Sequence, residues 1–487
     1  MRIILSRVLG AEALGTYQIA QSFFYVLVTV VASGLPSTIS HMSARYKVTK
    51  DKDAEGRAVS SSLIIGITIS IVLEIILLCC KNLIINATTK ETFTIILCLS
   101  PSILITAIYG SFRGALWGKQ KHIQNCLSEI GEQLTRLVLF FVLLYSAPTP
   151  MIGAIRAGLS YTISCLVSMF VSIIFYFKSG SVLRKPGKDF KKVLKSSLPI
   201  TLLHLVSSVV QPIIAIIVPY QLQCAGYSES QAVGLFGIIT GMTLPLLTLP
   251  DTLIGSYSTA LIPEISASMV KDNKRELENQ IKSAITFTLF ICFCFVPVYL
   301  SVGKEIGQFL FNNTTSGYLL AKASLVMIPM GLNSISQNIL NSLNMEFKSF
   351  KNYVIGSALM FLSIIFLPRY MGVNAMIIGM GGSIALSCML NLLMIEKYLG
   401  IKWLVVKPLG LMLLFAIPSS MIGSFLSGLL KFAMPQFFEI AISALAALTC
   451  FVLLCMIFNV VNISTIFVSL KRFKRTKIMK KRQKNVV

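Results

Sequence analysis

The chain has 487 residues, of which 55% are hydrophobic and 13% are charged, and its formal net charge is +24. Soluble domains carry about 25% charged residues, so this composition excludes an appended soluble catalytic domain and is typical of a polytopic membrane protein. The positive charge does not indicate a nucleic-acid ligand, because the Lys and Arg residues gather in alternate loops between apolar segments.

The chain begins with a short apolar segment that is followed by a long one. Residues 13–44 contain no Asp, Glu, Lys or Arg and are numerous enough to cross a bilayer once with tilt. Pro36 lies inside this run and predicts a bend, because proline donates no backbone hydrogen bond. Met1–Gly10 has the pattern of the outer end of a span. We therefore expect either a chain that starts with a truncated first helix or a true start that lies upstream.

Thirteen apolar segments are predicted to cross the membrane as helices, in addition to the N-terminal half-helix. The predicted fold is thus an all-α polytopic membrane protein. Two further segments, 114–132 and 266–282, mix polar and apolar residues at helical spacing, and we expect them to lie along the inner membrane surface. The thirteen spans cover residues 17–40, 61–81, 92–112, 133–147, 151–177, 196–219, 232–263, 283–303, 317–343, 352–368, 371–396, 406–429 and 438–461.

The loops between these spans predict the orientation of the chain. Loops after odd-numbered spans, together with the C-terminal tail, hold 33 Lys and Arg residues, whereas the alternate loops hold 5. Positive charge is retained on the cytoplasmic side, so the first set of loops and the C-terminus are predicted to be cytoplasmic. The basic tail, residues 462–487, is interpreted as a topology anchor that contacts anionic lipids, in preference to a partner-binding segment.

Prolines and lysines repeat at a nearly constant distance along the chain. Pro36 and Pro263 are 227 positions apart, and Pro101 and Pro329 are 228 apart. Lys121 and Lys348 are again separated by 227 positions. Chance agreement is the alternative, but such offsets favour the internal duplication that is common in secondary transporters. The predicted organisation is an N-terminal helical lobe, 1–219, and a C-terminal lobe, 220–461, before the tail.

A few charged residues lie within or at the ends of the spans, where charge is costly and usually faces a cavity or a partner. Salt bridges and side chains that reach the interface are the structural alternative for each of them. The four cationic candidates for substrate binding are Arg2, Arg7, Arg113 and Arg156. Two acids are candidates for coupling to an ion: Asp251, which follows Pro250 at a helix break, and Glu74 in the middle of a span.

The ninth predicted span carries an amide face. Asn333, Gln337, Asn341 and Asn344 follow one another at spacings of 4, 4 and 3, which places them on one side of a helix. Amides also hold helices together in lipid, but four in a row favour a water-filled cavity. The cysteines and histidines form no ligand set, so no metal or other cofactor is expected.

Several segments together resemble the stage V sporulation protein B family of the multidrug/oligosaccharidyl-lipid/polysaccharide exporter superfamily, which also contains the lipid II flippases. The resemblance extends over essentially the whole chain. It implies fourteen helices in two pseudo-symmetric lobes around a central cavity, and it places Arg2 and Arg7 at two basic positions of the first-helix motif. The matching segments are Arg2–Gln18, Ser33–Pro36, Phe112–Gly114, Leu198–Thr201, Gly241–Leu246 and Leu261–Ser266.

This resemblance implies a flippase that moves an undecaprenyl-linked saccharide, a peptidoglycan precursor or a related polysaccharide unit, across the cell membrane for spore-envelope synthesis. No ATP-binding phosphate loop is present, so an ion gradient of H⁺ or Na⁺, or the membrane potential, is the expected drive. A cation-coupled multidrug antiporter of the same superfamily is the nearest alternative. A membrane-embedded glycan enzyme is disfavoured by the short outward loops, and a scaffold that holds envelope-synthesis enzymes is a third possibility.

Overall fold

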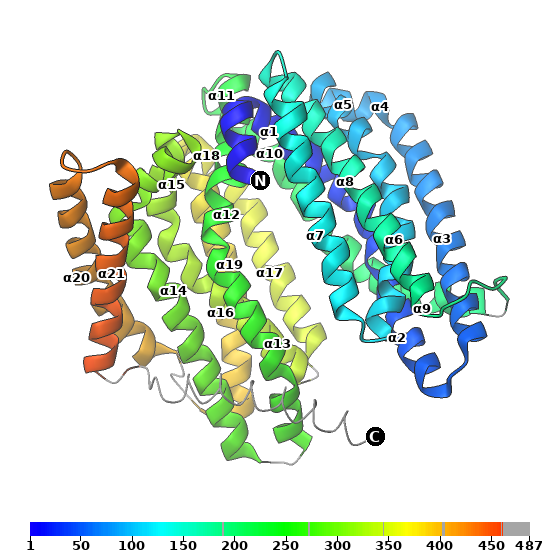
Figure 1. Cartoon of the computed structure of the whole chain (residues 1–487). Helices are drawn as coiled ribbons and strands as arrows, with labels where there is room; N and C mark the ends of the chain where they lie inside the picture. The colour runs from blue at the N-terminus through cyan, green and yellow to red at the C-terminus, as the bar shows by residue number, and fades with distance from the viewer. Residues whose placement is uncertain (188, 271–272, 344, 402–404, 459, 461–487) are drawn as a thin grey trace. The chain divides into compact units, whose positions relative to one another are not determined.

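The computed structural model describes the chain except for residues 188, 271–272, 344, 402–404, 459 and 461–487. The described elements are helices, and no strand occurs among them. They form two compact units, Met1–Gly241 and Met242–Val487, which are drawn in Figure 1. The lobe boundary expected near residue 219 stays a prediction. Asn344 of the amide face and the basic tail from residue 462 lie outside the described residues.

The first unit is built from helices of very different lengths. Short helices sit end to end with longer ones where the chain bends inside a predicted span (Figure 1). In chain order the helices are α1 (Arg2–Ala32), α2 (Gly34–Thr49), α3 (Lys52–Cys79), α4 (Lys81–Ala87), α5 (Lys90–Leu99), α6 (Pro101–Gly118), α7 (His122–Leu139), the π-helical η1 (Phe140–Leu144), α8 (Pro150–Lys178), α9 (Asp189–Ser208), α10 (Val210–Cys224) and α11 (Glu229–Gly237).

A second π-helical segment, η2 (Ile238–Thr243), joins the two units. The helices that follow it are α12 (Leu244–Leu247), α13 (Leu249–Val270), α14 (Lys274–Phe311), α15 (Thr314–Ala323), the 3₁₀ turn η3 (Ser324–Val326), α16 (Met327–Ser342), α17 (Glu346–Phe366), α18 (Pro368–Met371), α19 (Asn374–Leu399), α20 (Val406–Leu430) and α21 (Gln436–Ile457).

Twelve helical segments in the described part of the chain are long and apolar enough to cross a membrane. The prediction of an all-α, multi-pass membrane protein is therefore confirmed. The predicted span 133–147 is not one of the twelve. The end of α7 and the segment η1 occupy it, and the charged residues Glu132 and Arg136 interrupt the apolar sequence of α7. The count of thirteen spans stays a prediction.

The prediction of two separate surface helices at 114–132 and 266–282 is wrong. Residues 114–118 end α6, and residues 122–132 are the first turns of α7, which packs along α8. The second segment is divided in the same way between the end of α13 and the start of α14. In both cases the mixed polar pattern belongs to the ends of helices that continue as apolar segments.

A bend is present at the position that Pro36 predicts. The helix breaks at Ser33, whose φ and ψ are −101° and −69°, and α2 begins at Gly34. Pro36 lies in the first turn of α2, where a backbone N–H has no intrahelical acceptor and its loss costs nothing. The helix also kinks earlier, at Gly10, whose φ of +68° is accessible mainly to glycine.

A row of glycines on α6 lets α2 approach closely. Gly110, Gly114 and Gly118 repeat every fourth residue and therefore share one face of the helix. A Cβ atom on Gly114 would lie 2.5 Å from the carbonyl oxygen of Pro36, and one on Gly118 would lie 2.3 Å from that of Ser40. Small residues at this spacing allow close backbone packing of membrane helices, where lipid gives no hydrophobic drive for association.

The glycine row gives a direct test of this packing. We expect Gly114→Ala to lower the stability of the protein by about 1–3 kcal/mol, because the added methyl group meets backbone that cannot move aside. Thermal unfolding in detergent, monitored by size-exclusion chromatography, measures the effect. Gly382→Ala is the matched control, since nothing lies within 4 Å of its Cβ position, and it should leave stability unchanged or slightly raised. Equal losses in both variants would contradict this account of the α2–α6 contact.

Candidate functional site

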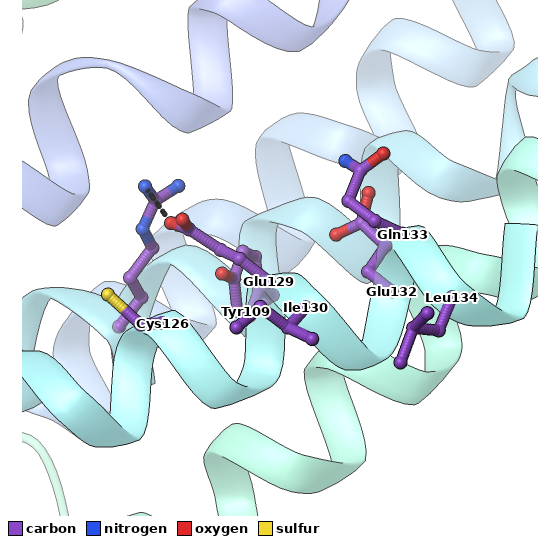
Figure 2. A pocket seen from close by; sticks show the side chains of 8 residues that line it. Tyr109, Cys126, Glu129, Ile130, Glu132, Gln133 and Leu134 are labelled. Atoms are coloured by element: carbon purple, nitrogen blue, oxygen red, sulfur yellow. Dashed lines mark ion pairs between the residues drawn. The ribbon is translucent and has the colours of Figure 1, made fainter. Parts of the chain in front are cut away.

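A charged pocket lies beside α6 and α7 in the first unit. Its volume is about 630 Å³. Figure 2 shows Glu129, Glu132 and Gln133 projecting from α7 around it. Its polar lining comes from Tyr109 and Arg113 of α6 and from Cys126, Glu129, Glu132 and Gln133 of α7. Of the four cationic candidates from the sequence, Arg113 is the one that lines this pocket.

Arg113 is held by a carboxylate and by two aromatic rings. Its Nη2 lies 2.5 Å from Oε1 of Glu129, and its guanidinium carbon lies 4.3 Å from the centre of the Trp117 ring and 5.6 Å from that of Tyr109. Nε of Arg113 is buried and makes no hydrogen bond. The guanidinium is therefore fixed in orientation, by the ion pair and by cation–π contacts, while one of its donors is unused.

A second ion pair lies one turn further along α7. Arg136 pairs with Glu132, and its Nε donates to Oγ of Ser164 on α8 at 3.0 Å. The guanidinium also lies 4.2 Å from the centre of the Tyr161 ring. The side chains of Arg136 and Glu132 are only 13% and 15% exposed. This pair is thus packed between helices, where a charge without a partner would be costly.

Glu129, Glu132 and Arg136 were not identified from the sequence. They fall in or beside the segment that was expected to lie on the membrane surface, where charges need no special explanation. The available signal is their spacing of three and four residues, which places them on one helical face and allows the i,i+4 pair. That they meet Arg113 of α6 and Tyr161 of α8 depends on how the three helices pack.

The other predicted arginines lie apart from this pocket. Arg2 is exposed, and its Nη1 donates to the carbonyl oxygen of Thr240 at 3.3 Å. Arg7 is also exposed on α1. Arg156 donates from Nη1 to the carbonyl oxygen of Leu143 at 3.1 Å and to Oγ of Ser146 at 2.9 Å. Because Leu143 lies at the end of η1, Arg156 donates to a backbone carbonyl that has no acceptor role within the helix, and it also bonds the hydroxyl of the following Ser146.

The amide face of α16 divides into a buried part and an exposed part. Nδ2 of Asn391 on α19 donates to Oδ1 of Asn333 at 3.2 Å, and Nδ2 of Asn352 on α17 donates to Oδ1 of Asn391 at 2.9 Å. Asn391 is fully buried, so this chain of amides connects three helices. Gln337 is half-buried and Asn341 is exposed, and the role of both as cavity residues stays a prediction.

The two predicted coupling acids differ in their surroundings and lie in different units. Asp251 is in the first turn of α13, and its Oδ1 is buried without a hydrogen-bond partner. Glu74 is half-buried in α3, and its neighbours Ile75 and Leu78 are exposed apolar residues. In the part of the chain that the structure describes, no three His, Cys, Asp or Glu residues form a group that could hold a metal ion.

The first 269 residues match the family model described as "Polysaccharide biosynthesis protein". The chain belongs to this family. The resemblance predicted from the sequence is thereby confirmed, and the matched region contains the first unit with the glycine row, the charged pocket and the Arg156 contact. It also extends through most of α13, which carries Asp251.

Two curated relatives from Bacillus subtilis (strain 168) resemble this family member. Stage V sporulation protein B is 25% identical over 371 residues, which cover 73% of this chain and 71% of the relative. Sporulation protein YkvU is 22% identical over 335 residues, which cover 66% of this chain and 73% of the relative.

Two solved structures show the same fold at low sequence identity. The lipid II flippase MurJ in an inward closed conformation aligns with a TM-score of 0.68 and 19% identity over 94% of this chain and 95% of the other. An inward-facing multidrug resistance MATE family transporter of the MOP superfamily aligns with a TM-score of 0.70 and 16% identity, over 82% of this chain and 93% of the other.

Removal of one charge of the Glu132–Arg136 pair should lower the stability of the protein, and removal of both charges should restore most of it. We expect Arg136→Gln to cost roughly 3 kcal/mol, because it leaves a largely buried carboxylate without its cation. The double variant Glu132→Gln/Arg136→Gln should regain most of this loss. Lys282→Gln is the matched control, since the i,i+4 pair Lys282–Glu278 is 46% and 34% exposed and such pairs contribute about 1 kcal/mol or less. Thermal unfolding measures all three; a double variant as unstable as Arg136→Gln alone would refute the pairing argument.

The buried amide chain predicts a second effect. We expect Asn391→Ala to destabilise the protein by about 1–3 kcal/mol, because it removes the partner of Asn333 and a partner of Asn352 at once. Asn341→Ala, on the exposed part of α16, should not change the unfolding temperature. A similar loss in both variants would show that the stabilising role is not specific to the buried amides.

Proposed function

We propose that this protein is a transporter, and not an enzyme, that moves a lipid-linked saccharide from one face of the membrane to the other. The observation that carries the proposal is the match of residues 1–269 to the polysaccharide biosynthesis family, combined with a MurJ-like fold over 94% of the chain. A carrier of this kind must cross the membrane, and the described chain contains helices that are long and apolar enough to do so.

The chemistry of such a cargo fits the cationic residues of the first unit. A sugar–pyrophosphate headgroup cannot enter hydrocarbon alone, because its charges and hydroxyl groups would lose their water. Arginine forks replace that water with paired, charge-assisted hydrogen bonds. Arg2, Arg7 and Arg113 are proposed to bind the headgroup in turn while the lipid tail stays in the bilayer and the lobes alternate their access. Arg156 is a weaker candidate, since its guanidinium is engaged by the end of η1.

The finer identity of the cargo is proposed from the relatives. The relative named Stage V sporulation protein B supports a role in spore formation, and the lipid II flippase MurJ, which shares the fold, supports a peptidoglycan precursor. The proposed cargo is therefore an undecaprenyl-linked peptidoglycan precursor or a related polysaccharide unit used in spore-envelope synthesis. The protein would then lie in the cell membrane with its C-terminus in the cytoplasm, and envelope-synthesis enzymes would be its partners. Asp251 is proposed as the acid that couples transport to H⁺ or Na⁺, because its Oδ1 is buried without a partner; Glu74 is the alternative.

A cation-coupled drug antiporter is the second candidate. The MATE transporter shares the fold, and two carboxylates, Glu129 and Glu132, line the charged pocket. Both of them are paired with arginines, however, so the pocket as a whole does not favour a cation. The pocket therefore offers a cationic drug no unpaired carboxylate.

A reconstituted translocation assay tests the proposal. Proteoliposomes with the full-length protein should flip a fluorescent undecaprenyl-linked saccharide, and Arg113→Gln should slow the initial rate about tenfold by removing a headgroup ligand. Asp53→Asn, which alters an exposed ion pair of the first unit, serves as the control and should retain the parental rate. Efflux of a cationic dye that depends on Asp251, without flipping of the saccharide lipid, would establish the antiporter instead. A folded preparation that does neither would support a scaffold.

A further inference from the structure

The charged pocket of the first unit contains an anion already, the carboxylate of Glu129. We propose that this pocket binds the pyrophosphate group of an amphiphilic lipid, and that Glu129 is an internal competitor that the lipid anion displaces from Arg113. The inference rests on the proposed transport of a lipid-linked saccharide and names a site and a controlling residue within it.

The first step concerns the hydrogen bonds that Glu129 leaves unmade. Its carboxylate engages Nη2 of Arg113, whereas Nε of the same guanidinium is buried and makes no hydrogen bond. A buried donor without an acceptor is costly. A pyrophosphate presents more oxygens than one carboxylate and can accept from Nε and Nη2 together, as phosphate groups do with arginine forks.

A second polar residue lines the same pocket. Tyr109 is 7% exposed, and its hydroxyl is buried close to Ser128. The Tyr109 ring also contacts the Arg113 guanidinium. Tyr109 and Arg113 lie one turn apart on α6 and both line the pocket, so an anion that takes the place of the Glu129 carboxylate would lie beside both residues.

The third step is that Glu129 is able to leave. The Glu129 side chain is 44% exposed and that of Arg113 is 31% exposed, in contrast to the largely buried Glu132–Arg136 pair. Exposed ion pairs are weak because water screens them. A group with greater negative charge can therefore replace the carboxylate, while the Trp117 and Tyr109 rings keep the guanidinium in place.

The apolar side of the pocket indicates that the ligand has a tail. Ile130 and Leu134 line the pocket and are 52% and 58% exposed. Leu127 and Val138 extend this exposed apolar stripe along α7 in both directions. A charged pocket that adjoins such a stripe lets an amphiphilic lipid keep its hydrocarbon chain in the bilayer while its anion is bound, because the bilayer lies against the same face of the helix.

The fluorescence of Trp117 can report binding at this site. The chain has 2 tryptophans, Trp117 and Trp403, so a Trp403→Phe parent leaves a single tryptophan in contact with the Arg113 guanidinium. The full-length parent is placed in nanodiscs of neutral phosphatidylcholine and titrated with undecaprenyl pyrophosphate. The change in Trp117 emission gives the apparent Kd, and inorganic pyrophosphate is titrated separately to distinguish a lipid headgroup from the free anion.

We expect Glu129→Gln to lower the apparent Kd for undecaprenyl pyrophosphate by about three- to tenfold, because the competing carboxylate is gone while the shape of the side chain is kept. The gain should vanish in the double variant Glu129→Gln/Arg113→Gln. Asp53→Asn is the matched control, since it removes another ion-paired carboxylate from the same unit, and it should change the Kd by less than twofold. Inorganic pyrophosphate should bind at least tenfold more weakly than the lipid.

Other results would overturn the inference. An unchanged Kd in Glu129→Gln, in a variant with the parental unfolding temperature, would show that Glu129 does not compete. An equal gain in Asp53→Asn would show a general effect of charge. Flipping of the saccharide lipid by these same variants separates the inference from the proposed function. If the protein flips the lipid but Glu129→Gln has no effect on binding, Glu129 is not a competitor and the transport proposal still holds. If the protein neither binds nor flips the lipid, both proposals are wrong.

Discussion

The ion pairs of α7 are the constraint on which the first unit depends. A helix that carries Glu132 and Arg136 could not lie among apolar helices if these largely buried charges were unpaired, because burial of an unpaired charge costs several kcal/mol. They pair with each other, and the more exposed Glu129 pairs with Arg113 of α6. Pairing allows a polar pocket to form within an apolar bundle, and this pocket is where we propose that the anionic cargo binds.

The two units connect their helices through polar side chains of different kinds. The first holds charged groups in pairs with aromatic support, whereas the second connects α16, α17 and α19 through the neutral amides of Asn333, Asn352 and Asn391. Amide chains connect helices without net charge, whereas charge pairs that are partly open to solvent can exchange partners.

The sequence predicted what depends on local pattern. Apolar runs identified the helices, Pro36 marked the break between α1 and α2, and Arg113 was singled out because a charge at the end of a span needs a reason. The partners were beyond reach, since Glu129 and Tyr161 meet their arginines only after helices have packed. Asn333 illustrates the same limit: its helical face was evident, but the hydrogen bond to Asn391, 58 positions away, follows from tertiary structure.

The glycine row of α6 has a mechanical consequence for the neighbouring arginine. Arg113 is adjacent to Gly114, whose backbone lies close to the carbonyl oxygen of Pro36, so α6 and α2 are held backbone to backbone beside the guanidinium. A relative shift of these two helices would bring atoms into collision along the glycine row. If a lipid anion replaces Glu129 as proposed, the exchange takes place at a guanidinium whose supporting backbone is restrained.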